Sequence, residues 1–274
     1  MDVDPLADTV PPRHAIESDD EDEYNPLETL HGKPKSFDIK LAGFSPSNEL
    51  IVATGSVAEI WARGADLGEQ IGSVFVHELE VGLLFQPRWI AAPVVISEVS
   101  TRLPLWAIRQ YATTILDSVQ PERLILLDEY PAPAYISSSR LVKAPIRYLS
   151  TDNYFSPEAQ PFAPPNLVQS ASAAFVAHQA ERSRHARLFL FPTSFVGSPA
   201  PRDLVPSHRL VLHEDGLGVW DDILLTTAHK LLCQSLMNPG PIQAVSSWTT
   251  PPPKKPSAAR ARPVGSEAEY SMYI

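Results

Sequence analysis

The residues best suited to chemistry lie where an apolar run gives way to polar residues. Leu50 to Ala53 form such a run, and Gly55 and Ser56 follow it at the start of an amphipathic segment. Amide groups at the start of a helix can receive an anion, so this turn is the best candidate for a phosphate or carboxylate site. The glycine spacings of phosphate loops, dinucleotide-binding loops and hydrolase elbows do not surround it. We therefore favour a plain strand-to-helix turn, with Ser56 as the helix N-cap.

The second candidate is a pair of adjacent acids, Asp128 and Glu129, at the end of the apolar run that begins at Arg123. Carboxylates at the carboxyl end of a central strand are well placed for acid–base catalysis. Neighbouring residues on a strand point to opposite faces, however, so the two side chains should diverge. We interpret the pair as an acidic turn rather than as a catalytic dyad.

The histidines and the single cysteine do not form a ligand set. His208 and His213 are five residues apart on a predicted strand and should point to opposite faces, and His229 has no second ligand at metal-binding spacing. Cys233 cannot form an internal disulfide, and its apolar neighbours recur at helical spacing, which predicts a buried thiol. These residues predict no metal, no cofactor and no enzymatic activity.

The net charge of −10 is concentrated at the start of the chain. Residues 1–30 hold ten acidic residues and one arginine, so the remainder is nearly neutral. A nucleic-acid partner is not expected, because the body offers no basic excess. No apolar run approaches the roughly 20 residues of a membrane span, and the first residues lack the pattern of a secretory signal. We expect a protein of the cytoplasm, with the nucleus as an alternative compartment.

Apolar runs and amphipathic segments alternate between residues 37 and 237. Strands are predicted within 50–53, 71–79, 81–86, 88–99, 123–128, 144–151 and 187–194. Helices are predicted from Ser56, from Pro104 to Val119, within 166–181, and from Asp221 to Leu236 with Leu224, Leu225, Ala228, Leu231 and Leu232 on the buried side. This alternation predicts a single three-layer α/β domain, with a mostly parallel sheet and helices on both faces. Residues 151–165 are expected to form a surface loop or part of an interface.

The two ends differ from this body in composition. Residues 1–36 are predicted to be a disordered acidic leader, and residues 238–270 a flexible Pro-rich linker. Residues 271–274 then bring Met272, Tyr273 and Ile274 beside a carboxylate. Such a triplet can enter a pocket on a partner: the carboxylate of Ile274 meets a lysine or amides, the ring of Tyr273 packs, and Met272 seals the rim. A ligand for a PDZ domain, which reads Ile274 and Met272, is the alternative.

Several segments, in their order along the chain, resemble the proteasome assembly chaperone 1 family. They are the acidic leader, LIVATGSVAEIWA (50–62), PNLVQSASAAFVAHQAERSRHARLFLFPTSF (165–195) and the final Met-Tyr-Ile. The likeness covers roughly residues 45–236 and the last three residues. LVKAPIRYLST (141–151) is instead similar to a segment of proteasome assembly chaperone 2, which leaves open which member of the pair this chain is.

The resemblance implies a particular fold and role. The fold would be an α/β sandwich related to nucleoside phosphorylases without retained chemistry. The chain would form a heterodimer with a proteasome assembly chaperone 2-like subunit and cap the outer face of the core-particle α ring. Met272, Tyr273 and Ile274 would dock between proteasome α subunits. The enzyme alternative is a nucleoside-phosphorylase-like activity, which would need an anion-binding pocket beside Gly55 and Ser56.

Overall fold

The computed structural model describes most of the predicted domain. It covers residues 37–99, 101–137, 144–197, 199–206, 220–236 and 248–249. The predicted leader, the docking segment 271–274, most of the linker 238–270, and His208 and His213 lie outside these ranges. The predictions made for them stay predictions.

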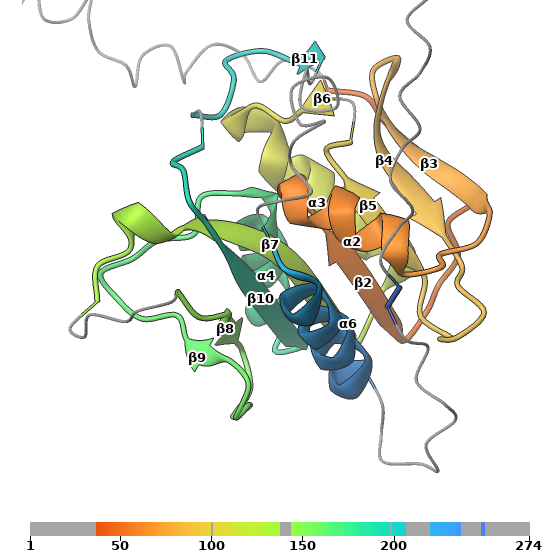
Figure 1. Cartoon of the computed structure of the whole chain (residues 1–274). Helices are drawn as coiled ribbons and strands as arrows, with labels where there is room; N and C mark the ends of the chain where they lie inside the picture. The colour runs from red at the N-terminus through yellow and green to blue at the C-terminus, as the bar shows by residue number, and fades with distance from the viewer. Residues whose placement is uncertain are drawn as a thin grey trace, which may run out of the picture.

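Strands and helices alternate along the described chain (Figure 1). The strands are β1 (Ile39–Ala42), β2 (Glu49–Ala53), β3 (Gln70–Val76), β4 (Leu79–Phe85), β5 (Val94–Ser97), β6 (Thr101–Arg102), β7 (Arg123–Pro131), β8 (Arg147–Ser150), β9 (Gln160–Pro161), β10 (His185–Thr193) and β11 (Val205–Pro206). The helices are α2 (Gly55–Gly64), α3 (Leu105–Val119), α4 (Ala171–Glu181) and α6 (Asp222–Leu236), with a 3-10 turn, η2 (Ala132–Ala134). Each predicted apolar run within the described residues therefore contains a strand, and each predicted helix is present. The strand predicted around His208 and His213 lies outside these residues.

Nine of the strands form one mixed sheet, in the order β1-β3-β4-β5-β2-β7-β10-β8-β9. The four central strands, β5, β2, β7 and β10, are parallel to one another, as predicted. The flanks are mainly antiparallel: β1, β3, β4 and β5 pair in that way on one side, and β8 pairs with β10 on the other. The sheet is thus mixed, with its parallel part confined to the centre. Strands β6 and β11 form a separate antiparallel pair.

Strand β7 divides the core into its two layers. The side chains of Leu124 and Leu126 belong to the apolar cluster formed with α3 and α4. Those of Ile125 and Leu127 belong to the cluster formed with α2 and α6. All four are fully buried, because side chains alternate across a strand and helices cover both faces. Figure 1 shows α2 and α6 on the viewer's side of the sheet and α4 behind it. The predicted three-layer α/β domain is confirmed.

Three local predictions are refined by the structure. The N-cap of α2 is Thr54, in an extended conformation, and Ser56 lies inside the first turn. Leu224 of α6 is only partly buried, whereas the other four residues predicted on that side are buried. Residues 151–165 are not entirely loop, since β9 pairs with β8. Cys233 is buried as predicted, and burial raises the pKa of its thiol to about 11.

Candidate functional site

The candidate site lies at the carboxyl ends of β2 and β7, which are neighbours in the sheet. The helix that follows β2 is α2, which covers one face. After β7 the chain passes through η2, β8 and β9 before it reaches α4, which covers the other face. Ligands of open α/β sheets bind where neighbouring strands send their helices to opposite faces in this way. The crevice beside Gly55 and Ser56 is therefore where the topology would place a ligand.

In this protein the crevice is occupied by the carboxylate of Glu129. The Oε2 atom of Glu129 accepts a hydrogen bond from the amide of Ser56 at 3.1 Å. A Cβ atom on Gly55 would lie 3.1 Å from Cδ of Glu129, and the φ of Gly55 is +80°. Both the backbone conformation and the close approach of Glu129 therefore require glycine at this position. The chain supplies its own anion to the start of α2, where the helix dipole favours negative charge.

The neighbouring acid, Asp128, points to the other face of the sheet. Its side chain accepts hydrogen bonds from the hydroxyl of Ser170, the N-cap residue of α4, and from the amide of Glu129 at 2.8 Å. Burial raises the pKa of Asp128 to about 7, and the hydrogen bond from Ser170 opposes that rise only in part. The two carboxylates diverge, as predicted, and each holds the first turn of a different helix.

Sequence reasoning found both halves of this arrangement but not the contact between them. The sequence offers Gly55 and Ser56 as the best candidate for an anion site, with a plain turn favoured, and Glu129 as an acid at the end of a strand. The residues of the contact are 73 positions apart, so only the parallel pairing of β2 with β7 brings them together. One signal for this contact was present in the sequence. The start of α2 lacks the glycine pattern of a phosphate loop, and an acid of the chain itself lies at the end of a central strand.

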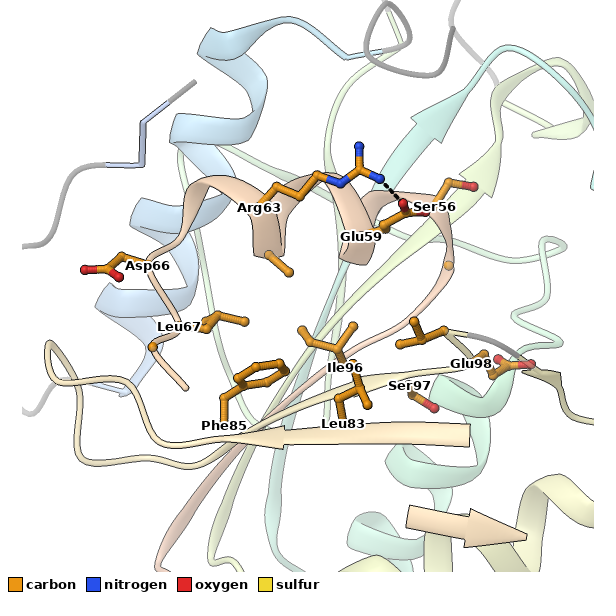
Figure 2. Close-up of a pocket in the computed structure, with 14 residues that line it drawn as sticks. Ser56, Glu59, Arg63, Asp66, Leu67, Leu83, Phe85, Ile96, Ser97 and Glu98 are labelled. Carbon is orange, nitrogen blue, oxygen red and sulfur yellow. Dashed lines mark hydrogen bonds and ion pairs between the residues drawn. The ribbon is translucent and has the colours of Figure 1, made fainter. Parts of the chain in front are cut away.

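A pocket of about 400 Å³ lies next to this crevice, under α2 (Figure 2). Leu83 and Phe85 of β4 and Ile96 of β5 form its apolar floor, and α2 contributes Glu59 and Arg63 to its rim. Its size is that of a small-molecule site, and such sites need a few polar groups directed into an apolar cavity.

Three of the four charged side chains that line this pocket, those of Glu59, Arg63 and Glu98, have partners within the protein. Glu59 and Arg63 form an ion pair one turn apart on α2. The Oε2 atom of Glu98 accepts a hydrogen bond from the hydroxyl of Thr54 at 3.1 Å, and its Oε1 atom accepts one from the amide of Leu103 at 2.9 Å. These pairings hold the turns after β2 and β5 together, which is a structural role.

The remaining polar groups of the pocket do not form a nucleophile–base arrangement. The hydroxyl of Ser97 donates a hydrogen bond to the hydroxyl of Tyr111 at 2.9 Å, and Tyr111 belongs to the core on the opposite face of the sheet. No histidine, lysine or cysteine is among the residues that line the pocket. A serine nucleophile at Ser56 would therefore lack a neighbouring base of those types. The geometry favours a cavity for apolar contact over a reaction centre.

The other sequence candidates do not converge on this site. His229 lies on α6 between the rings of Trp61 and Trp89, with centroid distances of 6.2 and 4.7 Å. Within the described ranges, no group of three histidine, cysteine or acidic residues could hold a metal ion. In the same part of the chain, no helix combines the length and apolar character needed to cross a membrane. Met272, Tyr273 and Ile274 fall outside the described residues.

Among known proteins, this chain shows similarity to solved structures only. No family model and no curated protein matches the chain. PbaA of Pyrococcus furiosus, an archaeal homologue of proteasome-assembly chaperone, is 14% identical over 72% of this chain and 89% of its own, with a TM-score of 0.44. A protein of unknown function from Thermoplasma acidophilum is 13% identical over 69% and 85%, with a TM-score of 0.42. PbaB of Pyrococcus furiosus, an archaeal proteasome activator, is 7% identical over 57% and 81%, with a TM-score of 0.41. Similarities at these values do not carry a conclusion about this chain.

Truncating the carboxylate of Glu129 should destabilise the domain. We expect Glu129→Ala to lower the free energy of unfolding by about 1–2 kcal/mol, because the amide of Ser56 loses a charged acceptor at a helix start. Glu129→Gln keeps an acceptor and should lose less. Denaturant unfolding measures both changes. Glu122→Ala, at the exposed opposite end of β7, is the matched control and should change stability by no more than about 0.5 kcal/mol. Equal stability of Glu129→Ala and the wild-type chain would contradict the assigned role.

Proposed function

We propose that this chain is a proteasome assembly chaperone. It pairs with a proteasome assembly chaperone 2-like subunit, caps the outer face of the core-particle α ring, and docks Met272, Tyr273 and Ile274 between α subunits. The observation that carries the proposal is the ordered resemblance of residues 50–62 and 165–195 to that family, together with the hydrophobe-Tyr-X triplet at 272–274.

The placement of these two segments is consistent with a shared structural role. Residues 50–62 form β2 and most of α2, and residues 165–195 form α4 and β10. Strand β7 lies between β2 and β10 in the sheet. Its two final acids hold one segment each, Glu129 through the amide of Ser56 and Asp128 through the hydroxyl of Ser170. The two segments that resemble the family are therefore both held by hydrogen bonds to the central strand β7.

The crevice supports a binding role over the nucleoside-phosphorylase-like alternative. An enzyme of that kind needs an anion subsite that is open to its substrate. Here the amide of Ser56 is already bonded to Glu129, Glu59 is paired with Arg63, and Glu98 accepts a hydrogen bond from Thr54. We propose that the body acts as a folded platform and that docking is carried by the C-terminal triplet.

Affinity purification of the full chain from cells tests this proposal. Core-particle α subunits and a second chaperone subunit should copurify with it. A chain that lacks residues 272–274 should still copurify with the second chaperone but should recover fewer α subunits, because the body and not the triplet would form the heterodimer. If neither α subunits nor a second chaperone copurifies with the full chain, the proposed function is wrong.

A further inference from the structure

Among the described residues of the C-terminal linker, Trp248 and Thr249 contact the domain. This tryptophan lies in a stretch rich in proline and small residues, yet its side chain is only 6% exposed. It belongs to the apolar cluster formed with α2 and α6. Burying an aromatic side chain of this size is strongly favourable, so the contact can hold a chain segment in place.

Two hydrogen bonds fix this contact at the end of α2. The indole Nε1 of Trp248 donates to the carbonyl of Trp61 at 3.1 Å. The amide of Thr249 donates to the carbonyl of Gly64 at 3.0 Å. Both acceptors lie in the last turn of α2, where carbonyl groups lack partners within the helix. The linker thus supplies donors that the helix needs, which makes the contact specific rather than merely apolar.

Gly64 provides the space for this contact. A Cβ atom at position 64 would lie 2.4 Å from two atoms of the Trp248 indole and 2.5 Å from the carbonyl oxygen of Thr249. Gly64 does not have a left-handed φ, so its own backbone does not require glycine. Gly64 is the last residue of α2, so its cost relative to alanine is smaller there than the cost of about 1 kcal/mol in a helix interior. Its presence here is explained by the tryptophan that it accommodates.

We propose that Trp248 and Thr249 form a latch that sets where the docking triplet leaves the domain. The inference rests on the proposed function. With the latch closed, the tether is residues 250–271 and starts at the end of α2; with it open, the tether is residues 237–271 and starts at the end of α6. A flexible chain of these lengths spans about 26 Å and about 33 Å, respectively. The latch therefore shortens the reach of the triplet and fixes its starting point.

The latch can be opened by a substitution that does not disturb α2. Gly64→Ala removes the space for Trp248 and replaces glycine with the best helix former. We expect the indole N–H of Trp248 in the full chain to exchange with solvent at least tenfold faster in this variant, as measured by NMR with Trp248→Phe for assignment. Gly197→Ala is the matched control, because a Cβ there meets nothing within 4 Å. If the wild-type indole exchanges as fast as that of a free peptide spanning residues 244–254, the latch does not exist.

The consequence for docking is measured separately, on the heterodimer bound to α subunits. Opening the latch should lower the apparent affinity about twofold, because the effective concentration of a tethered group falls as roughly the −3/2 power of tether length. Trp248→Ala should lower the apparent affinity by the same amount while Gly64 stays unchanged. This variant replaces Gly64→Ala in the experiment if Gly64→Ala does not fold. If both variants keep the wild-type affinity while deletion of residues 272–274 lowers it, the proposed effect of the latch on docking is wrong but the proposed function is not. If that deletion also has no effect, the proposed function fails and the proposed effect of the latch fails with it.

Discussion

Tyr273→Ala should weaken docking of the heterodimer on the α ring by at least tenfold. In the proposed complex the ring of Tyr273 fills the pocket between α subunits, and its hydroxyl finds a partner there. Truncating a buried aromatic anchor at the centre of an interface typically costs more than about 2 kcal/mol, which corresponds to more than a tenfold loss of affinity. Equilibrium binding of the full heterodimer to isolated α-ring intermediates measures the effect.

The chain contains its own control for this experiment. Tyr270 precedes the triplet by two residues, so Tyr270→Ala removes an identical side chain from the same segment. We expect that variant to bind the α ring within about twofold of the wild-type chain, since Tyr270 is outside the proposed motif. Equal losses in the two variants would show that the segment binds through general apolar character, and the triplet assignment would be wrong.

The same variant separates the two interpretations of the C-terminus. A PDZ domain reads Ile274 and Met272, so Tyr273→Ala should hardly change binding to it. Extending the chain by one residue beyond Ile274 moves the carboxylate and should weaken either complex. A partner that tolerates Tyr273→Ala but rejects the extension would identify the C-terminus as a PDZ-type ligand.

Asp128→Asn should make the domain markedly more stable at pH 8 while changing it little at pH 4. The pKa of Asp128 rises from an ordinary value of 3.8 to about 7 because the carboxyl group is buried. Between these values the folded chain keeps a proton that the unfolded chain has released, so stability falls as pH increases through this window. Above about pH 7 the whole cost of the buried charge is present. Asparagine keeps a similar shape and never carries that charge.

The measurement is the difference in unfolding free energy between Asp128→Asn and the wild-type chain, followed from pH 4 to pH 8. That difference should rise by on the order of 2–4 kcal/mol, since one pKa unit corresponds to about 1.4 kcal/mol. Taking the difference cancels the contribution of every other titrating group. A flat difference for Asp128→Asn would mean that Asp128 titrates at an ordinary pKa in the folded chain.

The fold class was predictable because the central strands are marked by composition. The run from Arg123 to Asp128 is apolar on both faces, which is possible only for a strand covered on both sides, and β7 is such a strand. The antiparallel flanks were not predictable in the same way. A short apolar run such as β3 or β4 indicates a strand but carries little information about its partner or direction.

The site was predictable only in pieces. Thr54 and Ser56 are both suitable N-cap residues two positions apart, and sequence alone favoured the wrong one. The contact of Glu129 with Ser56 and that of Trp248 with α2 join residues far apart in the chain. Local patterns do not encode such contacts: the first depends on the pairing of β2 with β7, and the second on where the linker meets α2.

The paired acids of β7 have a mechanical consequence for the domain. Two consecutive residues of one central strand grip the first turns of α2 and α4, which lie in opposite layers. Each helix start is held by a different one of these two residues, so neither helix can shift along the sheet without breaking a hydrogen bond to the same strand. A body held in this way at the centre of its sheet would suit the proposed function, in which residues 272–274 and not the body carry docking.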